Sequence, residues 1–133
     1  LFPYTTLFRS LHTIMANGEP TKKVSVELLC LSLLQEKDMY GYEMSQEIFR
    51  RSGGLLSMAE AAIYMSMYRL VKRGVVTDRR ELSGDVKSRV RVYYHLTESG
   101  MEYFQEILAD YKRSAQGMQN FFAYHTEDDH ERN

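Results

Sequence analysis

The chain has 133 residues, of which 44% are apolar and 26% are charged. This length suits one domain, and this balance is typical of a folded globular protein rather than a disordered one. No run of about 20 apolar residues is present, which excludes a membrane-spanning helix. The single cysteine, Cys30, cannot form an intramolecular disulfide, so we expect a reduced, cytoplasmic protein.

The charges are sorted along the chain, although the formal net charge is only -1. Residues 50–91 carry ten Lys or Arg against four Asp or Glu, whereas residues 97–133 carry three against eight. A basic middle beside acidic ends is typical of a local contact with nucleic acid, where cations must lie opposite phosphates. The alternative is a chance clustering of charges on solvated faces.

Residues 1–20 lack sustained periodicity and end in a segment that contains Gly18 and Pro20. A positive start followed by an apolar stretch, which would mark a secretory signal, is missing from this sequence. Met15 stands just before a polar linker. We therefore expect a disordered or non-native extension, with natural translation starting at Met15.

The next part of the chain predicts three helices. Residues 24–36 are apolar on most sides, which favours a deeply packed helix. Residues 41–51 predict a second helix, because glycines follow it. Ser57 and Glu60 have the spacing of a capping box, which would open a third helix that extends to about residue 73. One buried stripe is predicted on the third helix from Ile63, Met67, Leu70 and Val71.

Two strand-like runs follow, residues 75–82 and 88–96, separated by a turn that contains Gly84. Apolar and polar residues alternate in the second run, which is typical of a half-buried strand, so the two runs predict a β-hairpin. The tip and outer face of this hairpin concentrate cations without matching carboxylates. These cations are Arg79, Arg80, Lys87, Arg89 and Arg91.

The last predicted helix begins after Thr97, which can cap it, and carries Glu98 in its first turn. Its apolar residues alternate at spacings of three and four, which is the pattern of a heptad seam. The seam consists of Met101, Phe104, Leu108, Tyr111, Ala115, Met118 and Phe122. We interpret this seam as a dimer interface; packing of the helix on its own domain is the alternative.

Three helices followed by a basic hairpin are the elements of a winged helix-turn-helix. The predicted fold class is mainly α with a small β-hairpin (α+β), in which a winged helix-turn-helix domain is followed by a C-terminal dimerisation helix. We assign residues 1–20 to the extension, 21–96 to the DNA-binding domain, 97–124 to the dimerisation helix and 125–133 to a polar tail.

This order of elements predicts a surface for double-stranded DNA. One helix fits a major groove, and hairpin arginines can pair with phosphates or enter a minor groove. Partial burial is the alternative for Tyr64 and Tyr68, and a solvated helix C-terminus is the alternative for Arg69 and Lys72. The candidate DNA-binding residues are Tyr40, Tyr42, Ala61, Tyr64, Tyr68, Arg69, Lys72, Arg79, Arg80, Lys87, Arg89 and Arg91.

Several motifs over about residues 24–122 resemble the PadR-like transcriptional regulators. The most specific are Tyr40-Gly41-Tyr42-Glu43 and the run RVYYHLTESG at residues 91–100. Weaker matches are Leu28-Leu29, Ile63-Tyr64, Arg69-Leu70 and Gly74-Val75-Val76. The single short C-terminal helix is similar to the smaller PadR subfamily. The resemblance implies a bacterial homodimer that represses nearby genes, and in several members small aromatic or cationic compounds cause release. A homodimer of this kind would read a pseudo-palindromic operator.

The chain departs from the family pattern at the start of the third helix. Ala61 and Ala62 stand where the family usually shows Gly-Thr, and Met65 stands where it shows Pro. The missing threonine removes a hydroxyl that could contact phosphate. Better-known drug-binding relatives use a pocket tryptophan, and this sequence contains none. That mode of ligand stacking therefore does not carry over.

An apolar or aromatic effector would fit between subunits if Met101 and Phe104 lined a cavity beside Leu28 and Leu31. A filled interface is the alternative. The sequence has no Gly-rich phosphate loop and no His-Glu-x-x-His motif, so we expect no catalytic residues, no cofactor and no metal site. Two rival functions stay open: a winged-helix module that binds protein instead of DNA, and a metal or redox sensor on the same scaffold.

Overall fold

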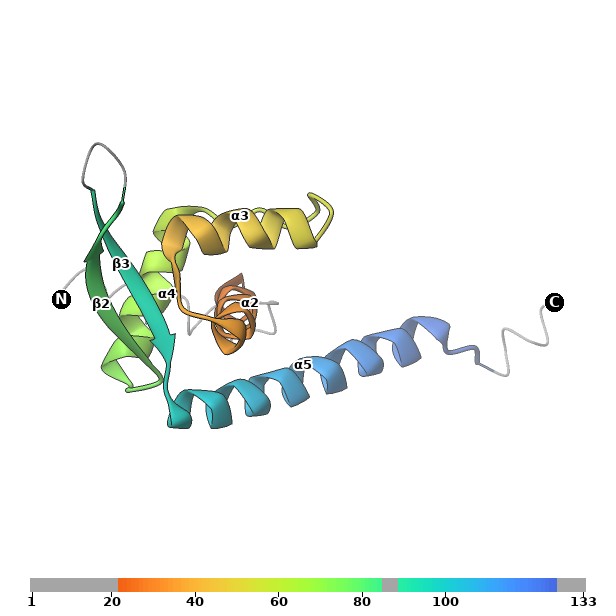
Figure 1. Cartoon of the computed structure of the whole chain (residues 1–133). Helices are drawn as coiled ribbons and strands as arrows, with labels where there is room; N and C mark the ends of the chain where they lie inside the picture. The colour runs from red at the N-terminus through yellow and green to blue at the C-terminus, as the bar shows by residue number, and fades with distance from the viewer. Residues whose placement is uncertain (1–21, 85–88, 127–133) are drawn as a thin grey trace.

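The computed structural model describes residues 22–84 and 89–126. Helix α2 lies centrally, with α3 and α4 on one side and α5 on the other (Figure 1). The predicted class, mainly α with a small antiparallel sheet, is confirmed. The elements in chain order are α2 (Lys22–Glu36), β1 (Met39–Tyr40), α3 (Gly41–Arg51), α4 (Glu60–Lys72), β2 (Val76–Leu82), β3 (Val90–Leu96) and α5 (Glu98–Ala123).

Parts of the sequence-based assignment lie outside the described residues, namely the extension at residues 1–20 and most of the polar tail. Within the described ranges, none of the helices is both long and apolar enough to cross a membrane.

The core forms where α2 meets α4, α3 and the base of the hairpin. The predicted stripe on α4 is confirmed, because Ile63, Met67 and Leu70 are fully buried and Val71 packs beside them. Cys30 is also fully buried, and burial, followed by the nearby charge of Glu27, raises its pKa to about 12. Because the thiolate is the reactive form, this environment argues against a redox sensor built on Cys30.

The sheet has the order β1-β3-β2 with antiparallel pairs, so β3 lies in its centre. Strand β1 is absent from the sequence-based assignment, because two residues are too few to show a strand periodicity. Met39 pairs with Tyr94, and Tyr40 pairs with Tyr93. This pairing attaches the start of α3 to the hairpin.

The hairpin is buried only at its base. Val76 pairs with Leu96 there, and both are buried, whereas the pair Leu82 and Val90 at the far end is 72% and 60% exposed. The alternation of apolar and polar residues in β3 predicts a strand that is half-buried along its whole length. This prediction is wrong for the far end of the hairpin. The reason is that the hairpin extends beyond the helices that cover its base (Figure 1).

The capping box predicted for α4 is also wrong. The helix begins at Glu60, with Ala59 as an N-cap whose side chain makes no capping bond. Ser57 lies in the preceding segment, which is attached to α3: the Ser45 hydroxyl donates to the Met58 carbonyl at 3.0 Å, and the Leu56 amide donates to Ser52 at 2.9 Å. These bonds attach the segment to α3, and the helix starts only after the extended Ala59.

The cap predicted for α5 is confirmed. The Thr97 hydroxyl accepts a hydrogen bond from the Gly100 amide at 3.0 Å and lies 2.7 Å from the Gly74 carbonyl oxygen. A Cβ added at Gly100 would lie 2.0 Å from the Val75 carbonyl oxygen, a distance that no side chain tolerates. The glycine therefore allows the first turn of α5 to rest on the backbone that follows α4.

Candidate nucleic-acid interface

A groove lies between the hairpin and the starts of α3 and α4. Its volume is about 450 Å³, and aromatic and cationic side chains dominate its walls. The lining residues are Tyr40, Tyr42, Glu60, Tyr64, Arg89, Val90, Arg91 and Val92. Five of the predicted DNA-binding residues thus meet in one place, although they come from three segments of the chain.

The tyrosines meet because Gly41 allows α3 to approach α4 closely. A Cβ at Gly41 would lie 3.1 Å from the ring of Tyr64, so any larger residue would push on that ring. Tyr42 and Tyr64 remain 50% and 44% exposed. Tyr64 is therefore partly buried against α3, as the alternative describes, and still exposes much of its ring, whereas Tyr68 is half-buried.

Cations stack on the aromatic rings of the sheet. The guanidinium of Arg91 lies 4.5 Å from the ring centroid of Tyr40, and that ring meets Tyr93 edge to face at 5.4 Å. On α4, the ammonium of Lys72 lies 4.5 Å from the ring centroid of Tyr68. These cation–π contacts orient the charges while leaving Lys72 exposed.

Arg79 differs from the other hairpin arginines because it has carboxylate partners. It forms ion pairs with Asp38 and with Glu81, and His95 Nδ1 lies 2.8 Å from Asp38 Oδ1. Burial acts to raise the pKa of Asp38, but the hydrogen bonds from His95 and Arg79 outweigh it and hold that pKa below its usual value. The expectation that all the hairpin cations lack carboxylates is therefore corrected for Arg79.

Arg69, which the sequence predicts to face DNA, is mostly buried in this structure. Its side chain is 15% exposed and lies 3.6 Å from the carboxylate of Glu27, and it donates to the Ser66 hydroxyl at 3.1 Å. Arg69 follows the buried Ser66 by three positions and therefore shares its side of the helix. The alternative of a solvated cation at the helix end is wrong for the same reason.

Arg80 and Arg89 remain as exposed cations on the hairpin, and among the described residues neither has a carboxylate partner. Ala61 is exposed at the start of α4. Lys87 lies outside the described residues. For the argument below, we call six residues of α4 and the hairpin the reading surface: Ala61, Tyr64, Lys72, Arg80, Arg89 and Arg91.

Comparisons with known proteins agree with this geometry. Residues 30–106 match the model of the transcriptional regulator PadR-like family. The chain belongs to the PadR-like family. An uncharacterised protein of Lysinibacillus sphaericus is 36% identical over 87 residues, which cover 65% of this chain and 77% of that protein. The resemblance found in the sequence is therefore confirmed.

Solved structures of PadR-like and related regulators share the fold. A transcriptional regulator from Clostridium thermocellum is 28% identical and has a TM-score of 0.65, over 74% of this chain and 93% of that one. Bacillus subtilis PadR in complex with operator DNA is 24% identical and has a TM-score of 0.57, over 63% of this chain and 46% of that one.

The predicted dimer seam of this PadR-like chain divides into two parts. Phe104 is 4% exposed because it packs into the core of its own domain, and Met101, Leu108 and Ala115 are half-buried. The remaining seam residues are exposed: Tyr111 at 57%, Met118 at 60% and Phe122 at 75%. The alternative of packing on the same domain therefore holds for the first turns alone.

Of the four residues predicted to line an effector cavity, Leu28 and Phe104 line one apolar groove, and Leu31 and Met101 do not. Leu31 is fully buried in the core, and the Met101 sulfur instead accepts a hydrogen bond from Gln35 at 3.4 Å. An apolar groove of about 590 Å³ does lie between α2 and α5. Its lining is Leu28, Leu29, Ser32, Gln35, Leu56, Phe104, Gln105, Leu108 and Tyr111.

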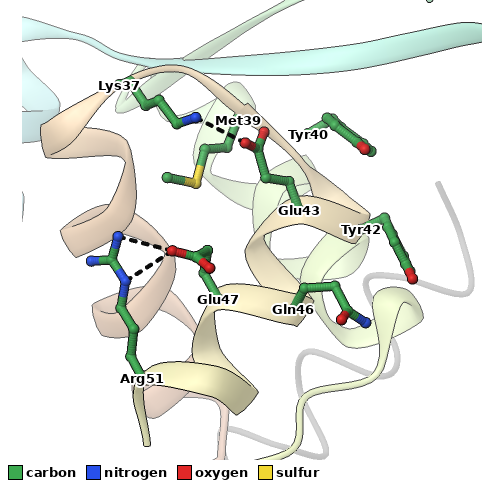
Figure 2. A pocket seen from close by; sticks show the side chains of 8 residues that line it. All are labelled: Lys37, Met39, Tyr40, Tyr42, Glu43, Gln46, Glu47 and Arg51. Carbon is green, nitrogen blue, oxygen red and sulfur yellow. Dashed lines mark hydrogen bonds and ion pairs between the residues drawn. The ribbon is translucent and has the colours of Figure 1, made fainter.

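Ion pairs surround α3 and join it to the end of α2. Figure 2 shows Lys37 reaching Glu43, at 3.0 Å, and Arg51 reaching Glu47, also at 3.0 Å. The hydrogen bonds from Arg50, and then from Arg51, lower the pKa of Glu47 to about 2. The arginines at the end of α3 are therefore neutralised, whereas Arg80 and Arg89 of the hairpin have no carboxylate partner within residues 22–84 and 89–126.

Proposed function

We propose that this protein is a DNA-binding homodimer that represses nearby genes and is released by a small apolar or aromatic effector. The observation that carries the proposal is the groove where the tyrosines of α3 and α4 meet the cations of the hairpin. The operator complex of the B. subtilis relative supports it, because that protein shares this fold.

The reading surface has the chemistry that duplex DNA requires. Tyr64 and Lys72 lie on the exposed side of α4, which would enter a major groove, and Tyr68 contacts Lys72 there. Arg80 and Arg89 lie on the hairpin, where guanidinium groups can pair with the flanking phosphates. Arg69 and Arg79 have no direct part in this contact, because their charges are committed to Glu27 and Asp38.

A second copy of the chain would complete the binding unit. The exposed end of α5 presents Met118 and Phe122, which would bury their apolar surface against a partner. Two winged domains related by a two-fold axis can contact half-sites about 34 Å apart in successive major grooves. A pseudo-palindromic operator follows from that symmetry.

The effector site proposed is the groove between α2 and α5. Its lining combines leucines and aromatic rings with neutral polar groups, and it includes no charged side chain. A ligand would release DNA only if it binds one spacing of the two winged domains better than the other. Occupation of the same groove by the partner's α5 is the competing outcome.

The proposal is tested by fluorescence anisotropy with the duplex upstream of the protein's own gene and a shuffled duplex of equal composition. Wild-type protein should prefer the natural duplex. Replacing Arg80 and Arg89 together by Ala removes up to two phosphate contacts per protomer, so the slope of log affinity against log salt should fall by about 3 to 4 in the dimer. The matched control, Arg113→Ala, removes an exposed cation of α5 and should leave the slope unchanged.

The alternative function, a winged helix that binds protein instead, predicts a different result. The acidic total charge and the altered start of α4 at Ala61, Ala62 and Met65 favour it. It would be supported if the wild-type protein showed no sequence-preferring DNA binding at about 50–100 mM salt, where phosphate contacts are strong.

A further inference from the structure

A partly buried polar network lies where the three helices α2, α4 and α5 meet. Glu27 of α2 is 4% exposed, and its Oε2 accepts a hydrogen bond from the Tyr103 hydroxyl of α5 at 2.7 Å. Its Oε1 lies 3.6 Å from Nη2 of Arg69 on α4. The guanidinium of Arg73, just after α4, lies 4.5 Å from the ring centroid of Tyr103.

The network links two helices that lie on different sides of α2. Helix α2 packs against both α4 and α5 (Figure 1). Its Glu27 contacts one residue from each of them, Arg69 of α4 and Tyr103 of α5. Burial, and then the hydrogen bond to Glu27, raises the pKa of Tyr103, so its hydroxyl keeps the proton that it donates. A shift of α5 along α2 would break this bond or move Glu27 relative to α4.

The network is poorly optimised for stability alone. Arg69 Nε is buried and has no hydrogen-bond partner among the described residues, which is a cost to the folded state. Apolar side chains of similar size often stabilise a site of this kind as well as a buried ion pair does. What a directional network adds is a defined arrangement of the groups that it joins.

We propose that Glu27, Arg69 and Tyr103 are positioning residues, which fix the orientation of α4 relative to α5. The proposal rests on the proposed function: α5 joins the two copies and α4 reads DNA, so this orientation sets the separation of the two α4 helices. Arg69 thus acts on DNA recognition through Glu27 and Tyr103 rather than by touching the duplex.

The test measures how sharply the dimer distinguishes half-site spacings. A duplex selected by wild-type protein from a randomised pool is rebuilt with one or two base pairs added to or removed from its centre. Tyr103→Phe removes the hydroxyl and keeps the ring that Arg73 contacts. A second variant, Glu27→Leu with Arg69→Met, replaces the ion pair with apolar side chains. The matched control is Tyr124→Phe, which removes a hydroxyl from an exposed residue just after α5.

Wild-type protein and the control should prefer the selected spacing by roughly tenfold or more, because a misplaced half-site loses its contacts. Each network variant should lower this preference by about threefold or more. The salt slope and the dimer dissociation constant should stay unchanged, because the network touches neither phosphates nor the exposed end of α5. A residue that merely stabilised the fold would lower the melting temperature without changing the preference.

Three results would overturn the inference. The first is a Tyr103→Phe variant whose spacing preference equals that of the wild type. This result alone would overturn the inference if the double variant does not fold. The second is a lost preference that accompanies weaker dimerisation or a changed salt slope. The third is a wild-type dimer that binds the selected duplex without any spacing preference. If wild-type protein selects no duplex at all, the proposed function itself fails and the inference fails with it.

Discussion

The first turns of α5 and its last turns continue one apolar pattern, yet they have opposite surroundings. Gly100 and Phe104 are buried against their own domain, whereas Phe121 and Phe122 are 74% and 75% exposed on a segment that projects away from it (Figure 1). The comparison teaches that one helix can carry two interfaces in series. The first attaches it to the winged domain, and we assign the second to another copy of the chain.

The largest effect is expected from Gly100→Ala, which attacks the first interface. The added methyl would lie 2.0 Å from the Val75 carbonyl oxygen, so the first turn of α5 must leave the domain. We expect a loss of more than about 4 kcal/mol in the free energy of unfolding, enough to prevent folding near 37 °C. Circular dichroism during heating checks this, and a melting temperature close to that of the wild type would contradict it.

Phe104→Ala should have the next largest effect, because it leaves a cavity in the core. The expected loss in the free energy of unfolding is about 3 to 5 kcal/mol, measured by urea denaturation. Phe121→Ala makes the same chemical change on the exposed part of α5 and should cost less than about 0.5 kcal/mol in the monomer. Equal losses for the two variants would remove the distinction between the two parts of the helix.

Phe122→Asp tests the second interface without touching the first. A charge in an apolar contact between copies should weaken self-association by about tenfold or more, while the circular dichroism spectrum stays native. Sedimentation equilibrium at micromolar concentration measures the change. Asn120→Asp introduces the same charge elsewhere on the exposed part of α5, and its dimer should dissociate as the wild type does. If the wild-type protein were a monomer under these conditions, the exposed end of α5 would not be an interface between two copies.

The smallest effect, and one of opposite sign, is expected from Gly117→Ala. In the part of the chain that the structure describes, no neighbour lies within 4 Å of the added Cβ, so the methyl meets open space. The helix propensity of alanine should stabilise α5 by up to about 1 kcal/mol relative to glycine. Thermal unfolding at matched protein concentration detects this gain, and a loss instead would indicate that the glycine has a close neighbour in the dimer.

Local patterns are enough to predict most of the fold. Residues 41–51 are helical as their sequence indicates, and Thr97 caps α5 because a side-chain oxygen and a free amide three residues later suffice for that motif. The failures are those in which a distant segment decides. Ser57 stays outside α4 because Ser45 holds the neighbouring Met58, a contact that spacing along the chain does not reveal.

The sequence predicted which residue types form the candidate site. It predicted less well which of the arginines stay exposed and which pair with carboxylates. Arg69 and Arg80 look alike in sequence. Arg69 is held in a mostly buried ion pair by Glu27, which lies 42 positions earlier, whereas Arg80 stays exposed. Arg79 likewise forms an ion pair with a distant residue, Asp38. One signal for the meeting of the tyrosines was present, because a glycine between Tyr40 and Tyr42 permits the close approach of another helix.

The contacts of Asp38 with both hairpin strands affect how base changes in the operator would combine. Asp38 contacts both strands of the hairpin through Arg79 and His95, and it immediately precedes the strand that leads into α3. If the hairpin tilted against a minor groove, Tyr40 and Tyr42 would therefore move with it. Base changes beneath the hairpin and beneath the start of α3 should consequently change the binding free energy non-additively, because Asp38 couples the two contacts.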